Sequence, residues 1–116
     1  MDQRQRRQLH DAMVRLALGD REAFTLVFED LWPPLLAFMN RALPGHPDRE
    51  DLAQRTLLNV FARIAEFDVS RDGVAWVFGI ASYEVKTLRR QMQRRRETPA
   101  TGLDSDDRAD DAAGSP

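Results

Sequence analysis

Basic side chains gather at the end of the stretch WVFGIASYEVKTLRRQMQRRR, which covers residues 76–96. Six of them fall within residues 86–96, namely Lys86, Arg89, Arg90, Arg94, Arg95 and Arg96. Such residues neutralise phosphates and release counterions, which favours nucleic-acid binding regardless of base sequence. Trp76 and Tyr83 border this basic face, and aromatic rings can stack on unpaired bases. A solvated helix face, with arginines that complement the negative end of the helix dipole, explains the same charges equally well.

A second set of side chains has the spacing of one outer helix face. It consists of Asp51, Gln54, Arg55 and Leu58. A leucine among hydrogen-bonding groups is typical of a protein-docking surface, but single exposed leucines are also ordinary on any protein. The pattern alone leaves both interpretations open.

Residues that would support catalysis or metal binding are not grouped in this sequence. His10 and His46 are far apart, neither has a carboxylate at ligand spacing, and we expect both on the surface. Asp48, Glu50 and Asp51 are close together, but acidic residues are favoured at a helix start. No phosphate-binding glycine loop is present. The sequence therefore predicts no enzyme, no metal site and no cofactor.

Four helices are predicted to position these side chains, over residues 3–18, 20–42, 48–67 and 74–96. Gly19 is expected to end the first helix, and Asp20 and Asp48 are expected to cap the second and third. Pro33 and Pro34 are expected to kink the second helix, because its apolar spacing continues past them in phase.

The helical period also predicts which residues face the core. The second helix should bury Phe24, Val27, Phe28, Leu31, Leu35, Phe38 and Ala42. The third should bury Leu52, Ala53, Leu57, Val60, Phe61, Ile64 and Phe67. The fourth should bury Trp76, Val77, Ile80, Ala81, Val85, Leu88 and Met92. Glu84 also falls on the core side, where a carboxylate needs a partner.

Composition predicts one small helical domain with an acidic tail. The 116 residues are 42% hydrophobic and 31% charged, and they include no cysteine. Residues 98–116 contain five aspartates but only one basic residue, Arg108, and they include only one large apolar residue. We therefore expect a disordered tail or linker after a domain at 1–97. The N-terminus has no apolar signal segment and no run is long enough to cross a membrane, so we expect a cytoplasmic protein.

Three pieces of the sequence, in this order, carry a family resemblance. The most specific positions are Gly19-Asp20 with Ala23-Phe24, then Asp51-Leu52-x-Gln54 with Phe61 and Phe67-Asp68, then Ala75-Trp76-x-Phe78-x-Ile80-Ala81. Over about residues 8–96 the chain resembles region 2 of bacterial RNA polymerase sigma factors, especially those of the extracytoplasmic-function group. The resemblance implies a compact all-α fold, in agreement with the four predicted helices.

The resemblance also implies partners for both faces. Asp51, Gln54, Arg55 and Leu58 would dock on the clamp helices of the largest subunit of core RNA polymerase. The loop 68–73 and the last helix would meet the non-template strand of the minus-ten promoter element, whose unstacked bases are held in pockets. The residues implied for DNA contact are Phe67, Asp68, Ser70, Arg71, Ser82, Tyr83, Lys86, Arg89 and Arg90, whereas Trp76 is expected to anchor the core.

Several positions depart from the family pattern. Arg55 stands where an acidic residue is usual, and Gly79, Ser82 and Tyr83 stand where Arg, Arg and Asn are frequent. The second DNA-binding domain of such factors is not in these 116 residues, so we expect either a fragment or a standalone region 2. The alternative function is a sigma-like interaction module that binds an anti-sigma factor or acts as half of a split sigma factor.

Overall fold

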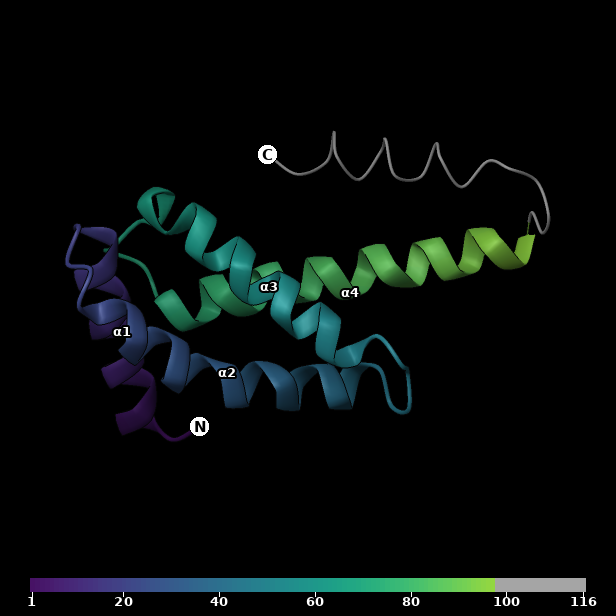
Figure 1. The fold of residues 1–116 in the computed structure, drawn as a ribbon, viewed down its shortest axis with the longest axis horizontal. Coiled ribbons are helices and arrows are strands. Elements are labelled where there is room, and N and C mark those ends of the chain that lie inside the picture. The colour runs from purple at the N-terminus through teal and green to yellow at the C-terminus, as the bar shows by residue number, and fades with distance from the viewer. Residues whose placement is uncertain (98–116) are drawn as a thin grey trace.

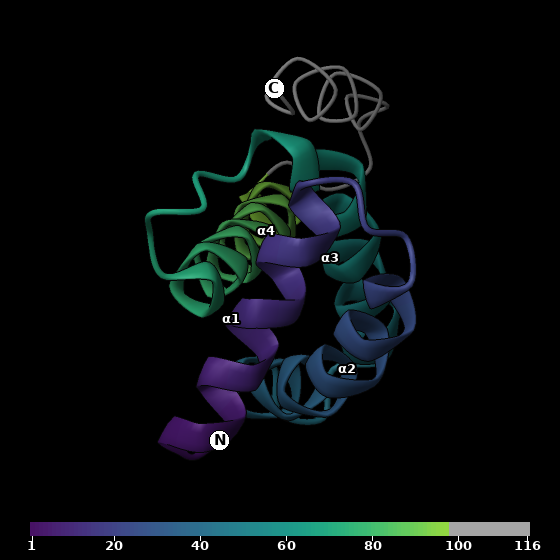
Figure 2. The same ribbon diagram turned by 90° about the vertical axis from the view of Figure 1, so that its left-hand side faces the viewer.

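Four α-helices and one 3₁₀ turn form the part of the chain that the structure describes, which is residues 1–97. In this computed structural model the elements are α1 (Gln3–Ala17), α2 (Ala23–Ala42), α3 (Arg49–Arg63), η1 (Ile64–Glu66) and α4 (Gly73–Glu97). The helices α2, α3 and α4 run roughly along the molecule and α1 crosses one end of them (Figures 1 and 2). The predicted bundle of about four helices is confirmed. The predicted tail at 98–116 lies outside the described residues.

The centre of the core belongs to α2. Its buried residues follow one another at intervals of four, Ala23, Val27, Leu31, Leu35 and Met39, and each is 0% exposed. Residues at that spacing share one helix face, which here meets α1, α3 and α4. The predictions for Val27, Leu31 and Leu35 are confirmed, and those for Phe24 and Phe28 are wrong. These two rings lie one position further round the helix and are 46% and 45% exposed.

Both prolines lie inside α2, which continues without interruption to Ala42. Each proline lacks the N–H that would bond to the carbonyl four residues earlier, here that of Glu29 or Asp30. These four residues all line one open hollow of about 410 Å³, so this stretch of α2 borders solvent. The apolar face therefore continues across the prolines, as the sequence predicts.

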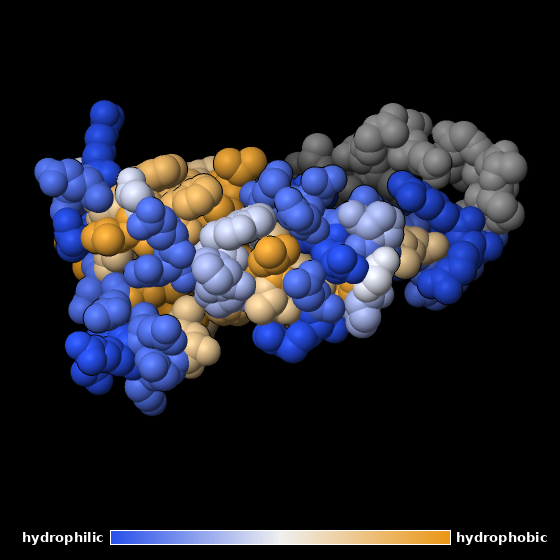
Figure 3. Space-filling model, turned by 60° about the horizontal axis from the view of Figure 1, so that its bottom comes forward, coloured by the Kyte–Doolittle hydropathy of each residue, from blue (hydrophilic) through white to orange (hydrophobic). Residues whose placement is uncertain are grey.

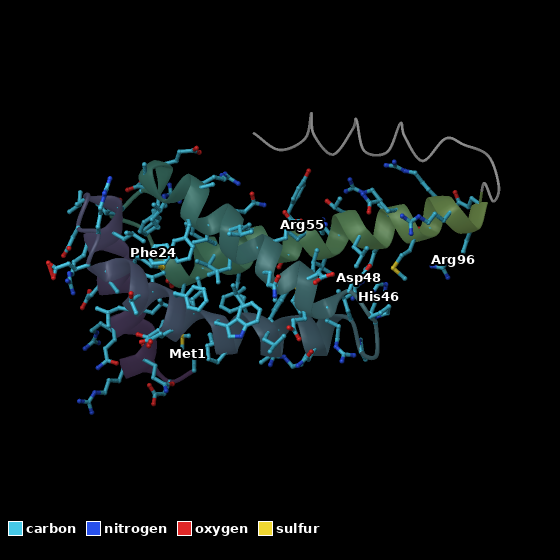
Figure 4. The ribbon with its side chains drawn as sticks, in the orientation of Figure 1. Met1, Phe24, His46, Asp48, Arg55 and Arg96 are labelled. Carbon is cyan, nitrogen blue, oxygen red and sulfur yellow. The ribbon has the colours of Figure 1, made fainter. Side chains whose placement is uncertain are left out.

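Two predicted caps differ from the structure. The carboxylate of Asp20 accepts the N–H of Glu22 at 3.1 Å and pairs with Arg15, while α2 itself begins later, at Ala23. Asp48 precedes α3, but its side chain makes no capping hydrogen bond. Its backbone, at φ −93° and ψ 7°, lacks the extended geometry of a capping residue. Its own N–H donates instead to Nδ1 of His46 at 3.0 Å (Figure 4).

The third helix ends earlier than predicted, at Arg63, and tightens into η1 over Ile64–Glu66. Phe67 then takes an extended conformation and directs the chain into the loop before α4. Its side chain is 5% exposed. The apolar pattern extends to Phe67 because this ring returns to the core after the helix has ended.

Three contacts fix the start of α4. Oδ1 of Asp72 accepts the N–H groups of Val74 and Ala75 at 3.0 and 3.2 Å, as a capping carboxylate does. Oδ2 of the same side chain lies 2.6 Å from Nη2 of Arg6 on α1. The hydrogen bond from Arg6 and those from the backbone of Ala75 and Val74 lower the pKa of the Asp72 carboxyl.

The third contact joins α4 to a histidine. Nδ1 of His10 accepts the N–H of Gly73 at 3.0 Å. The expectation of a merely surface histidine is therefore wrong for His10, which is half-buried and accepts a hydrogen bond from a distant part of the chain. A Cβ at position 73 would lie 3.1 Å from Nδ1 of His10 and from Sδ and Cε of Met13. A side chain at position 73 would therefore require His10 or Met13 to shift.

The two glycines of α4 provide a matched pair of substitutions. We expect Gly73→Ala to lower the free energy of unfolding by about 1–3 kcal/mol, because the new methyl group must displace His10 or the fully buried Met13. Gly79→Ala should raise it by about 0.5–1 kcal/mol, because position 79 is exposed, helical and free of neighbours within 4 Å. Urea unfolding of both variants checks this, and equal midpoints would contradict it.

Asp72 should make stability depend on acidity. We expect Asp72→Ala to lower the free energy of unfolding by about 0.5–2 kcal/mol at neutral pH through loss of the cap. Because the pKa of this carboxyl is lowered by folding, its contribution is complete above the ordinary value of 3.8 and is lost as the pH falls below it. The gap between wild type and variant should therefore close in strong acid, as measured by unfolding between pH 2 and pH 7. The substitution Asp11→Ala, at an exposed position of α1, is the control.

Candidate nucleic-acid interface

The loop between η1 and α4 is held by its own polar groups. Oδ1 of Asp68 accepts both the N–H and the hydroxyl of Ser70, at 3.0 and 2.7 Å, and the N–H of Arg71 donates to the carbonyl of Asp68 at 2.9 Å. The hydrogen bonds from Ser70, with a smaller attraction from Arg71, lower the pKa of the Asp68 carboxyl. The loop is thus a turn of fixed shape whose polar side chains face solvent.

A hollow of about 700 Å³ opens beside this turn. Its lining consists of Phe67, Asp68, Ser70, Arg71, Asp72, Ala75 and Trp76. The aromatic part of the wall is formed by Phe67 and Trp76, whose ring centroids are 5.2 Å apart. The lining thus combines two aromatic rings with polar and charged groups, a combination that suits a flat, partly polar ring.

Two aromatic residues differ in their role at this hollow. Phe67 is 5% exposed and meets His10 edge-on at 6.1 Å, so it lies under the turn and does not project from it. Trp76 is half-buried and packs against the core, in the position of an anchor, while it also lines the hollow. Both rings therefore line the hollow and also pack against the core.

The outer face of α4 is exposed where the helical period predicts it. Ser82, Lys86, Arg89 and Arg90 are all exposed, and Tyr83 is 47% exposed. Arg89 nevertheless donates from Nη2 to the carbonyl of Ala42 at 2.7 Å, where it satisfies the end of α2. Lys86 and Arg90 make no salt bridge within residues 1–97. The cations that this face offers most directly are therefore Lys86 and Arg90.

The outer face of α3 presents Asp51, Gln54, Arg55 and Leu58 to solvent. Leu58 is 69% exposed, which agrees with its predicted outward position. Arg55 lies beside the crossing of α3 and α4, with Nη1 3.9 Å from Oε1 of Glu84 (Figure 4). The Glu84 side chain is only 11% exposed, and its Oε2 accepts a hydrogen bond from Asn59 at 2.8 Å. Asn59 and Arg55 are therefore two of the partners of this carboxylate.

An aromatic cluster on α2 and α3 escaped the sequence prediction. The rings of Phe24 and Phe61 stack at 4.3 Å, and Phe28 continues the stack at 6.5 Å from Phe24. Apolar surface gathers over the half of the molecule nearest α1, whereas the projecting end of α4 is hydrophilic (Figure 3). The spacing of Phe24 and Phe28 correctly predicted that they share one helix face. That face lies at the edge of the core, where α3 covers it only in part.

Other kinds of site receive no support from the described residues. Within residues 1–97 there is no group of three or more His, Asp or Glu side chains placed to hold a metal ion. In the same residues no helix has the length and apolar character required to cross a membrane.

Comparison with known proteins identifies the family. Residues 27–96 match the model of sigma-70 region 2. A solved structure, the NMR structure of an engineered region 2 of sigmaE in complex with GTAAAA, aligns with a TM-score of 0.64 at 23% identity and covers 83% of this chain and 97% of that one. A search of curated proteins found no match. The resemblance that the sequence motifs indicate is confirmed by this agreement of family model and fold: the chain belongs to the sigma-70 region 2 family.

Proposed function

We propose that this domain docks on core RNA polymerase and helps recognise and melt the minus-ten promoter element during transcription initiation in the cytoplasm. The observation that carries the proposal is the match of residues 27–96 to sigma-70 region 2. The fold relative was solved in complex with GTAAAA, which supports DNA as the ligand class. Region 2 domains act in initiation without being enzymes.

The docking face for polymerase would be the exposed side of α3. Its solvent-exposed leucine is flanked by Gln54 and Asp51, which supply hydrogen-bonding groups around an apolar centre. Interfaces combine an apolar centre with a polar rim in this way. Arg55 would add a cation whose charge is partly offset by Glu84, because their nearest atoms are 3.9 Å apart.

The DNA face would combine the turn at 68–72 with the outer side of α4. An unstacked base would enter the hollow beside Phe67 and Trp76, where Asp68, Ser70 and Arg71 supply polar groups at the rim. Removal of a base from the stack favours melting of the duplex. Lys86 and Arg90 would neutralise backbone phosphates, with Ser82 and Tyr83 beside them and with Arg89 available if its bond to Ala42 opens.

A second candidate function is that of an interaction module for an anti-sigma factor or for the other half of a split sigma factor. The stack of the exposed Phe24 and Phe28 with the half-buried Phe61 favours it, because aromatic residues are enriched in protein interfaces. Affinity capture separates the two functions. Retention of core polymerase supports the first, and retention of a regulatory protein without polymerase supports the second.

Two exposed leucines test the polymerase face. We expect Leu58→Ala to weaken binding to purified core polymerase by about tenfold, as truncation of a central interface residue does. Leu18→Ala is the matched control, because Leu18 is 74% exposed on another part of the surface and should leave the affinity unchanged. Equal affinities for the two variants, measured by fluorescence titration, would remove α3 from the interface.

Paired neutral substitutions test the DNA face of α4. The double variant Lys86→Gln with Arg90→Gln should reduce the salt dependence of single-stranded DNA binding by a slope of about 1.4, since each lost contact with a single strand accounts for about 0.7. Arg95→Gln with Arg96→Gln removes the same charge near the end of the helix and should change the slope by less than half as much. Fluorescence anisotropy with oligonucleotides that contain GTAAAA measures both, and indistinguishable slopes for the two double variants would argue against the assigned face.

A further inference from the structure

We propose that α1 adds a phosphate-binding site to this DNA interface, in a second hollow on the other side of the turn. The site would take a phosphodiester of the same single strand whose base enters the first hollow. This inference rests on the proposed function and extends it, because α1 lies wholly before the residues that match the family model.

The second hollow has a volume of about 320 Å³ and lies where α1 passes the loop. Figure 2 shows α1 crossing the end of the bundle beside the chain that joins η1 to α4. The lining comes from both segments and consists of Gln3, Arg6, Arg7, His10, Ser70, Arg71 and Asp72. Ser70, Arg71 and Asp72 also line the first hollow, so the two sites share one wall.

The charge of this lining favours an anion. Three arginines, Arg6, Arg7 and Arg71, face a single carboxylate, that of Asp72. Both oxygens of that carboxylate are already used, Oδ2 by Arg6 and Oδ1 by the N–H groups of Val74 and Ala75. Asp72 therefore repels an incoming phosphate less than a carboxylate without partners would. The other two arginines, Arg7 and Arg71, remain available to bind the phosphate.

The arginines differ in their freedom to bind. Arg6 is held by Asp72 and fixes α1 against the loop. Arg71 lies 3.7 Å from Asp68 with 81% of its side chain exposed, which makes a weak pair that a phosphate can displace. Arg7 is exposed and makes no salt bridge within residues 1–97. Arg7 can therefore bind a phosphate without breaking a salt bridge, and Arg71 of the loop would bind the same phosphate.

The backbone amides at this end of α4 are not the binding groups. The N–H of Gly73 donates to His10, those of Val74 and Ala75 to Asp72, and that of Trp76 to the carbonyl of Asp72. Guanidinium groups thus supply the contacts, and planar guanidinium forks match phosphate oxygens well. Because the contact is made to the backbone, it should not depend on base sequence.

Two arginines of α1 provide the test. Arg7 lines the hollow, whereas Arg4, which is also exposed on the same helix, does not. Arg7→Gln and Arg4→Gln remove the same charge, and thermal unfolding should show both variants folded like the wild type. Anisotropy is measured with a single-stranded decanucleotide that contains GTAAAA and with a scrambled decanucleotide. A parallel series replaces one phosphodiester at a time by an uncharged methylphosphonate.

We expect Arg7→Gln to weaken binding about fivefold on both sequences and to lower the salt slope by about 0.7, the value for one phosphate contact of a single strand. Arg4→Gln should change affinity by less than twofold. The penalty for Arg7→Gln should vanish on the oligonucleotide that lacks the charge at one particular linkage.

Equal effects of the two substitutions, or an Arg7 penalty that persists on every methylphosphonate oligonucleotide, would overturn the phosphate site while leaving the proposed function intact. Competition by inorganic phosphate without any response to the methylphosphonate series would mark the hollow as a site for a free anion and would also overturn it. A wild-type protein that binds neither decanucleotide nor core polymerase would overturn the proposed function as well.

Discussion

The close approach of α1 to the first residue of α4 sets the geometry of the functional end of this molecule. It is favoured by the absence of a Cβ at position 73, since a Cβ there would lie 3.1 Å from side-chain atoms of His10 and Met13. The histidine then accepts the amide of Gly73, and Arg6 holds the carboxylate of the preceding residue. Without these contacts the loop of about six residues would sample many conformations, and binding would cost the entropy of ordering it. The contacts order the loop before a ligand binds.

The outer faces of α3 and α4 are separate surfaces of two helices that pack on the same core. The central helix α2 packs against α1, α3 and α4, which leaves the outer sides of α3 and α4 free. The proposed polymerase face lies on the first and the proposed DNA face on the second, joined by the rigid turn that follows η1. Since both helices pack on the same buried row of α2, a partner bound to one face holds the other in a fixed orientation.

Most of the fold was predictable from the sequence because helical periodicity reports directly on burial. The exposed faces at Leu58 and at Lys86 and Arg90 follow from that period alone. The caps did not follow, because a capping aspartate is defined by its backbone angles as much as by its type. The role of His10 was out of reach for a stronger reason: its partner is 63 residues away, and no local pattern encodes such a contact.

The small polar group at the crossing of α3 and α4 has a consequence for how this sequence can change over time. Glu84 is nearly buried and depends on Asn59 and Arg55 for compensation. A change of Arg55 to an acidic residue would place a like charge beside the nearly buried carboxylate of Glu84, which disfavours the charged form of both groups. The effects of substitutions at positions 55, 59 and 84 are therefore expected to depend on one another, although the residues lie on two different helices.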